Sequence, residues 1–325
     1  LQRLPTNVQE SLKIASLIGY RFDEEILRHV LLSLSETKQI HTMNIDPLSD
    51  IPVSLDSVAS SLRASMKDGF IERTREGYQF SHDKLQLAFL SMIDSPEKDR
   101  YHVIIGEAYL ARGNAEATYH AAVHLQQAPS YATTESSRLE LAYIHLKAAK
   151  YCNKMSAFQD AAELLHHGLE LLNPKDKWTK HYDVTFQLTG MLSKMELIIG
   201  NHESCKAKAQ EVLSMAITTK SKVNALMIHV ECCMACNEMD ATIVAANQAL
   251  TLLGVTIPKK ITIRHVIMKL IQVKLMLGRK SDDYILNLPK MNDESMATTV
   301  RLLLHLYMYC LLKSEDLQGL YSALL

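Results

Sequence analysis

The chain has 325 residues, of which 47% are hydrophobic and 22% are charged, the composition of an ordinary globular protein. This length exceeds the usual size of one compact domain, so we expect two or three domains, or one small domain followed by a helical repeat. With 35 basic and 36 acidic side chains, the net charge of -1 offers no general attraction to nucleic acid or to an anionic membrane.

Glycine and proline are scarce, at 11 and 8 residues, which favours long helices. The six cysteines lie in apolar stretches with no paired framework, so we expect reduced, buried thiols in a cytoplasmic protein. No long apolar run predicts a membrane span, and no signal peptide follows Leu1. Because the helical pattern of residues 317–325 is still running at the last residue, we expect the chain to be part of a longer protein.

Residues 1–94 are predicted to form a winged-helix-like domain. Apolar residues at helical spacing predict a first helix that Gly19 ends, and a second helix that Asp23 caps. Two prolines and several polar residues predict a loop over 39–52, and a third helix is expected over Leu55–Lys67.

The period changes from helical to alternating between Phe70 and Phe80. Two short β-prone runs flank the turn Arg75-Glu76-Gly77, and this predicts a β-hairpin. A helix resumes over His82–Ile93, with Ser81 as its expected cap. Helices followed by a single hairpin describe a winged helix, within a fold class that we predict to be all-α.

Residues 95–325 show only helical pattern, with about ten helices in antiparallel pairs. Three segments share a polar opening turn, small residues and an apolar face, and they begin roughly forty residues apart, as in tetratricopeptide repeats. These segments are Met155–Leu172, Asn201–Met215 and Asn237–Leu253. The small residues that would let paired helices approach closely include Ala161, Ala162, Ala209, Ala245 and Ala246. One pair cannot bury its own apolar face, so we predict a tetratricopeptide-like α-solenoid whose groove binds protein partners.

Three stretches carry a family resemblance: YQFSHDKLQLAFLSMI (78–93), DRYHVIIGEAYL (99–110) and LELAYIHLKAAKYCNKMSAFQDAAELLHHGLELL (139–172). They resemble large STAND-class AAA ATPases, in which an ATPase domain precedes a winged helix and a tetratricopeptide-like region. Protein kinase, histidine kinase or nucleotide cyclase modules are attached to such proteins. The resemblance implies ATP or ADP and Mg²⁺ in the parent protein, with the ATPase domain upstream of Leu1.

This chain itself contains none of the motifs of those catalytic domains. It has no G-x-x-x-x-G-K-[ST] loop to cradle phosphates, and no H-R-D or D-F-G motif of a kinase. We therefore expect this chain to be no enzyme and to bind no cofactor by itself.

His82 and Asp83 follow the predicted hairpin directly and are the sharpest candidate site. Their common role would be local, because a carboxylate at a helix N-terminus is favourable. The resemblance implies a second role: STAND winged helices, as in plant immune receptors and apoptosome ATPases, carry a His-Asp pair at this position. There the histidine contacts the β-phosphate of ADP. Carried over, His82 would contact the ADP of the upstream ATPase, with Asp83 as its support, and both interpretations stay open.

The segment around Cys232 suggests a metal site, because Cys232 and Cys236 share one helical face and His229 precedes them by one turn. Structural zinc sites usually combine two ligand pairs, and no second pair stands out in the sequence. We therefore expect buried, metal-free thiols. His120 and His124 form an H-x-x-x-H pair upstream of His166-His167, but the glutamate of H-E-x-x-H is missing, so a zincin is excluded.

Residues 255–280 contain seven basic residues and no acid, and Ile263, Val266, Ile267, Leu270 and Ile271 form an apolar face among them. Such a helix could bind anionic lipid or calmodulin. A repeat helix with a solvated basic face is the more common case, and the apolar face would then be used for stacking. The single tryptophan, Trp178, is expected to anchor a contact between repeats.

Three functions are compatible with these patterns. The first is a regulatory arm of a signalling ATPase, which requires a P-loop upstream of Leu1. The second is a stand-alone tetratricopeptide adaptor, which requires none. The third is a DNA-binding winged helix, but the helix Leu55–Lys67 has only Arg63 and Lys67 as basic residues, which argues against nucleic acid as a partner.

Overall fold

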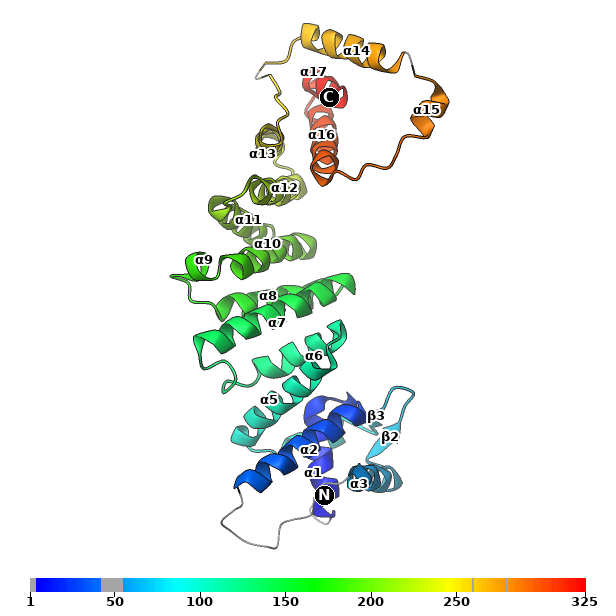
Figure 1. Ribbon diagram of the computed structural model, residues 1–325, viewed down its shortest axis with the longest axis vertical. Coiled ribbons are helices and arrows are strands. Elements are labelled where there is room, and N and C mark those ends of the chain that lie inside the picture. Colours follow the sequence, from blue (N-terminus) through cyan, green and yellow to red (C-terminus); the bar gives the residue numbers. More distant parts are fainter. Residues whose placement is uncertain (1–3, 42–54, 259, 279) are drawn as a thin grey trace. The chain divides into compact units, whose positions relative to one another are not determined.

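The computed structural model describes residues 4–41, 55–258, 260–278 and 280–325. It is 74% helix and 3% strand, so the predicted helical class is confirmed, with one small sheet (Figure 1). The chain divides into two compact units, residues 1–173 and 174–325. The predicted domain boundary at residue 94 lies inside the first unit and stays a prediction.

In the described part of its first ninety residues, the first unit contains four helices and three short strands. Its elements are α1 (Thr6–Ile18), β1 (Arg21–Phe22), α2 (Glu24–His41), α3 (Leu55–Lys67), β2 (Ile71–Arg73), β3 (Tyr78–Phe80), α4 (Asp83–Leu90), α5 (Ser95–Arg112), α6 (Ala115–Gln126), α7 (Glu135–Lys154) and α8 (Phe158–Glu170). The first and third predicted helices match α1 and α3. Helix α2 includes residues 39–41 of the predicted loop, and residues 42–52 of that prediction lie outside the described residues.

The predicted hairpin is present as β2 and β3, and it gains a third strand that the sequence did not indicate. β1 pairs antiparallel with β3, with Phe22 opposite Tyr78, so the strand order is β1-β3-β2. Gly77 makes this possible, because a Cβ on that residue would lie 2.5 Å from the carbonyl oxygen of Phe22. Its φ of 148° is also rare for residues with a side chain.

Aromatic side chains connect the sheet to the surrounding helices. The ring of Phe80 lies 5.8 Å from Phe22 and 6.3 Å from Phe89 on α4, and Phe80 and Phe89 are both fully buried. The same core continues into Ile105 on α5 and Ala121 on α6. The hairpin and the first long helix pair therefore share one hydrophobic core, which holds the start of α4 in place.

Among its described residues, the second unit has helices joined by loops and no strand. Its helices are α9 (Lys177–Lys180), α10 (Tyr182–Ile199), α11 (His202–Met215), α12 (Thr219–Ala235), α13 (Met239–Leu252), α14 (Ile263–Leu277), α15 (Asp282–Leu286), α16 (Glu294–Leu312) and α17 (Asp316–Ala323). The predicted segments 155–172, 201–215 and 237–253 contain α8, α11 and α13.

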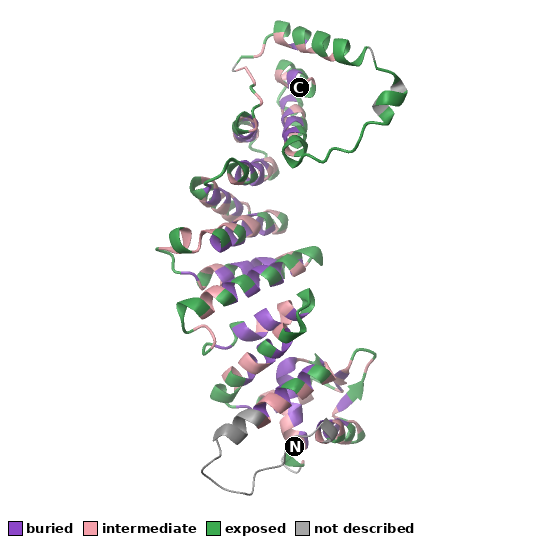
Figure 2. Cartoon of the chain, in the orientation of Figure 1, coloured by how far each residue is buried: buried purple, intermediate pink, exposed green. Residues whose placement is uncertain are grey.

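Within each unit, long helices pack against their neighbours in sequence. Helices α5 to α8 contact one another in order, and so do α10 to α13. The five alanines predicted to allow close approach are all buried. Figure 2 shows that buried, intermediate and exposed residues share these helices, so each helix has a buried side. Gly106 has the same role on α5, because a Cβ there would lie 2.5 Å from the Leu125 side chain of α6. The order changes after α13, which packs against α16, while α14 contacts α17.

The same turn joins the two helices of several pairs. Residues Ser156, Gly200, Asn237 and Ser314 adopt positive φ, between 58° and 89°, and the next residue's N–H donates to the carbonyl five residues earlier. This is the Schellman arrangement, which satisfies free carbonyls at a helix end. The acceptors of these four bonds belong to Cys152, Glu196, Cys233 and Cys310. The same backbone conformation and hydrogen bond therefore repeat along the chain, although the residue with positive φ is Ser, Gly or Asn.

Candidate functional sites

His82 and Asp83 lie at the junction of β3 and α4. His82, rather than the expected Ser81, is the cap of α4: its Nδ1 accepts a hydrogen bond from the backbone N–H of Lys84 at 3.1 Å. Asp83 Oδ1 accepts from the same N–H at 2.7 Å and also contacts His82 Nδ1. The local role considered for this pair is therefore present.

These contacts leave both side chains accessible. The His82 side chain is 61% exposed and that of Asp83 is 70% exposed. The contacts of the ring use Nδ1, so the Nε2 edge remains for a ligand from outside. A hydrogen bond from imidazole to a phosphate would be compatible with the capping role, because it would use the other nitrogen.

A cavity of about 660 Å³ lies beside the hairpin turn. Its lining residues come from β1, the hairpin turn, α5 and α6, and His82 is not one of them. Its charged residues include both signs, and Arg112 forms ion pairs with Asp23 at 2.9 Å and with Glu25 at 3.0 Å. The mixed lining does not favour a ligand of one charge.

The predicted H-x-x-x-H pair belongs to a buried aromatic cluster between α5 and α6. His124 Nδ1 lies 3.0 Å from His102 Nδ1, and the ring of Tyr109 stacks on His120 and His124. Burial lowers the pKa of His124 to about 3 and that of His102 below its usual value. Both rings are therefore neutral core groups near pH 7.

His145 on α7 is fully buried, and neither of its ring nitrogens has a hydrogen-bond partner. The nearest described ring is that of His167 on α8, with the centroids 6.3 Å apart. Burial lowers the pKa of His145 to about 4, and the nearby His167 adds to the effect. The sequence did not single out this residue, because nothing in its spacing distinguishes it from other helix residues.

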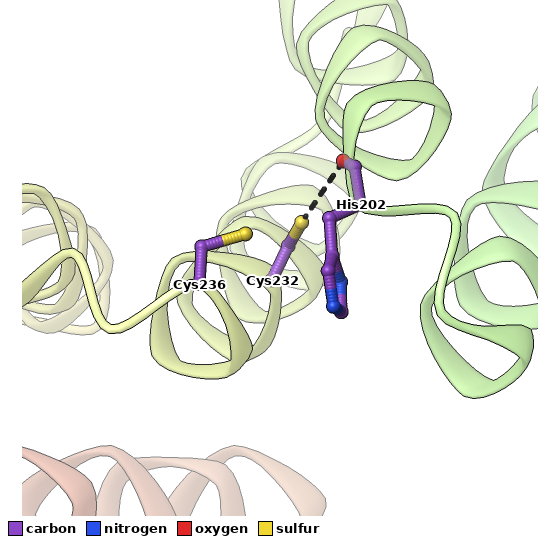
Figure 3. A group of neighbouring side chains, drawn as sticks. All are labelled: His202, Cys232 and Cys236. Atoms are coloured by element: carbon purple, nitrogen blue, oxygen red, sulfur yellow. Dashed lines mark hydrogen bonds between the residues drawn. The ribbon is translucent and has the colours of Figure 1, made fainter.

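The structure gathers His202, Cys232 and Cys236 from two helices, and their ligand atoms all lie within 4.8 Å of one another (Figure 3). Cys232 and Cys236 were considered as ligands from sequence. His202, at the start of α11, was missed, although an H-x-x-C pair formed by His202 and Cys205 is visible in the sequence. His229 instead turns to Cys233, with its Nε2 3.7 Å from that sulfur.

The basic segment contains α14. The apolar face of this helix was expected to stack against a neighbouring helix, and that expectation is wrong for most of the face. Of the five apolar residues predicted to line that face, Val266 is buried and the other four are exposed. The helix contacts α17 partly through His265, whose ring lies 6.3 Å from that of Tyr321. Lys259 and Arg279 of the basic segment lie outside the described residues.

Trp178 connects α9 to α11, and its expected role as an anchor between repeats stays a prediction. Its indole Nε1 donates to Glu211 Oε1 of α11 at 3.0 Å, and Lys177 Nζ lies 2.9 Å from the same oxygen. These contacts hold the pKa of Glu211 below its usual value, although burial opposes the effect. The ring serves a structural contact and does not line the cavity of the first unit.

Among the described residues, one helix, α16, is long and apolar enough to cross a membrane by length and composition alone. A single helix of this kind is weak evidence for a span, because core helices can have the same composition. Leu302, Leu306 and Cys310 of α16 are fully buried in the core of the second unit.

Comparison with known proteins finds no match: no family model, no curated protein and no solved structure resembles the chain closely enough to be reported.

The buried His145 should make stability depend on pH. In the unfolded chain, His145 binds a proton below about pH 6.5, whereas in the native chain it does so only below about pH 4. The free energy of unfolding therefore falls as the pH decreases through this window. The cost is about 1.4 kcal/mol per pH unit for one such group. The measurement is urea unfolding at pH 7 and at pH 5, followed by circular dichroism. The difference in the free energy of unfolding between the two pH values should be smaller for His145→Leu than for the unchanged chain.

At pH 7, His145→Leu should also raise the free energy of unfolding by about 1 kcal/mol, because two unpaired nitrogens leave the core. The exposed His29 on α2 provides the control. His29→Leu should leave the difference in the free energy of unfolding between pH 7 and pH 5 unchanged. An unchanged pH difference for His145→Leu would show that the ring is hydrated or paired in solution.

Proposed function

We propose that this chain is the regulatory and protein-interaction arm of a larger signal-transducing ATPase. In this proposal, residues 1–94 form a winged-helix-like domain and residues 95–325 form a tetratricopeptide-like α-solenoid. Binding of an effector or a protein partner on the helical surface would bias the nucleotide state and the output of the parent protein. The observation that carries the proposal is the repetition of helix pairs joined by one type of turn.

The repeated turn supports the solenoid. In the turns that join paired helices, the carbonyl acceptors at residues 152, 196 and 233 are separated by 44 and 37 residues, and the acceptor in the turn between α16 and α17 is at 310, a further 77 residues on. These separations approximate one repeat, one repeat and two repeats of the tetratricopeptide type. The same arrangement also ends α13, where Gly254 has positive φ and the Val255 N–H donates to the carbonyl of Leu250. Helix α14 falls in the double interval, where the sequential packing of the helices changes.

Exposed apolar side chains support a role in binding other proteins. Helix α14 exposes Ile267, Ile271 and Leu275 at successive turns, by 48%, 49% and 72%. Helix α16 likewise exposes Val300, Leu304 and Met308 opposite its buried face. Apolar surface of this kind, with basic residues beside it on α14, is typical of a docking surface for another macromolecule.

The coupling to a nucleotide is supported by the resemblance to STAND proteins and by the exposure of His82 and Asp83. Both follow the hairpin directly, where the resemblance implies a contact with the ADP of an upstream ATPase domain. ATP or ADP and Mg²⁺ would then belong to the parent protein, and this chain would be no enzyme. None of the six cysteines forms a disulfide, and this supports the cytoplasmic location in the proposal.

The second candidate is a stand-alone tetratricopeptide adaptor with no coupled enzyme, which the repeated helix pairs support equally. The two differ in one observation: an ATPase parent carries a P-loop upstream of Leu1 in the full gene, and an adaptor carries none. Reading that upstream sequence separates the two functions.

The isolated chain should not bind ATP, because its sequence contains no phosphate-cradling loop. Isothermal calorimetry with Mg²⁺ and ATP should give no saturable heat for residues 1–325. The full-length parent, measured in parallel, should bind. Saturable binding to the isolated chain would contradict the proposed division of roles.

His82→Ala in the full-length parent should speed ADP release and raise basal output. A hydrogen bond to a charged phosphate contributes about 1.5–3 kcal/mol, so its loss should shift the resting equilibrium by roughly ten- to a hundred-fold. Release of a fluorescent ADP analogue measures the effect.

His29→Ala changes another exposed histidine of the first unit and should leave ADP release unaltered. Circular dichroism of both variants tests folding, because His82 also caps α4. If His82→Ala destabilises the first unit and ADP release per folded molecule is unchanged, the residue is only a helix cap.

A further inference from the structure

We propose that His202, Cys205, Cys232 and Cys236 form a structural site for Zn²⁺ between the start of α11 and the end of α12. The sequence-based expectation of metal-free thiols depended on the lack of a second ligand pair. The structure places such a pair, the H-x-x-C of α11, beside the C-x-x-x-C of α12. The proposal concerns the second unit alone and does not depend on the proposed function.

The distances in this cluster are close to those of a metal site. The ligand atoms of His202, Cys232 and Cys236 lie within 4.8 Å of one another. In tetrahedral zinc sites, Zn–S bonds of about 2.3 Å and Zn–N bonds of about 2.0 Å place the ligand atoms roughly 3.5–3.8 Å apart. Small side-chain rotations would therefore be enough, because the helices already bring the three residues together.

Cys205 provides the fourth ligand. It is fully buried one turn after His202, and it packs in the same small core cluster as Cys232 and Cys236. One nitrogen ligand and three sulfurs, all from residues that are buried or half-buried, make a Cys₃His set, which is among the common structural sites of Zn²⁺.

An unpaired buried nitrogen points independently to a ligand. The Nδ1 atom of His202 is buried and has no hydrogen-bond partner, a state that costs free energy in a folded protein. The Cys232 thiol donates a 3.5 Å hydrogen bond to the carbonyl oxygen of His202, drawn as the dashed line in Figure 3. A cation bound by the ring and the thiolates would satisfy these groups together.

The surroundings suit a bound cation and its thiolates. Cys205 lies in the first turn of α11, whose N-terminal end favours a thiolate. Ser193 Oγ lies 3.6 Å from the Cys205 sulfur and can donate a hydrogen bond to it, as groups around metal ligands commonly do.

The ligand set favours a structural metal over a catalytic one. The four residues leave no open coordination position, so the metal would hold the ends of α11 and α12 together and activate no water. Each thiol would lose its proton on binding, which couples metal binding to the folded state.

Co²⁺ provides a spectroscopic test. The purified chain is stripped with a chelator under reducing conditions and titrated with Co²⁺. We expect one Co²⁺ per chain, with thiolate-to-cobalt charge-transfer bands and the intense visible bands of tetrahedral cobalt, and displacement by Zn²⁺. Elemental analysis of chain purified without added metal should find about one zinc per chain, and Zn²⁺ should raise the melting temperature of the stripped chain.

Substitutions identify the ligands. Cys236→Ser and His202→Ala, at the two half-buried positions, should each weaken Zn²⁺ binding by at least about ten-fold, in line with loss of a metal contact. The double variant Cys232→Ser/Cys236→Ser should abolish it. Cys205→Ser should keep Co²⁺ bound but remove one thiolate's share of the charge-transfer intensity. Cys233→Ser and Cys310→Ser remove buried thiols outside the cluster and should leave binding unchanged.

The proposal fails if the unchanged chain, shown to be folded by circular dichroism, contains no stoichiometric zinc and gives no tetrahedral cobalt spectrum. It also fails if Co²⁺ binding survives in Cys232→Ser/Cys236→Ser. Because Cys232 is fully buried, that variant could lose its fold, and the half-buried His202→Ala and Cys236→Ser then decide the matter.

Discussion

The close approach of paired helices is the constraint on which the rest of this structure depends. Two helices can bury a continuous apolar face only if small residues lie where their axes come nearest. Gly106 against Leu125 shows how little room there is, because even a methyl group at residue 106 would overlap the leucine. A single helix pair still exposes its other face, so each pair requires a neighbour, and the packing of α5 to α8 and of α10 to α13 follows from this requirement.

The turn between paired helices determines which side chains at the helix ends lie close together. A residue in the left-handed conformation reverses the chain within a few residues, so the end of one helix and the start of the next lie side by side. Helices α11 and α12 pack against each other, and His202 of α11 thereby reaches Cys232 and Cys236 of α12. Residues thirty positions apart become neighbours through packing, and the proposed metal site is a product of that geometry.

The first unit uses the same kind of packing for a different purpose. The aromatic side chains of β1, β3 and α4 fill one core, and they fix the short connection in which His82 caps α4. A residue held in this way has a defined position but an exposed ring. Such a combination suits a contact with another domain, because the ring needs no rearrangement before it binds.

The sequence by itself was sufficient for features with a local cause. The helical period, the cap at Asp23, the stop at Gly19 and the hairpin around Gly77 depend on residues close together in the chain, and α1, α3 and the β2–β3 hairpin appear where the pattern predicts them. His82 and Asp83 were also identifiable, because their position after the hairpin is a local feature. Only the tertiary structure decided what depends on distant residues. It paired β1 with β3, turned the apolar side chains of α14 outward, buried His145 without a partner and brought His202 to the cysteines of α12. Hydrophobic periodicity records which residues of a helix can be buried, but the orientation of each helix is set by the neighbours available to cover it, and these neighbours lie far away in the sequence.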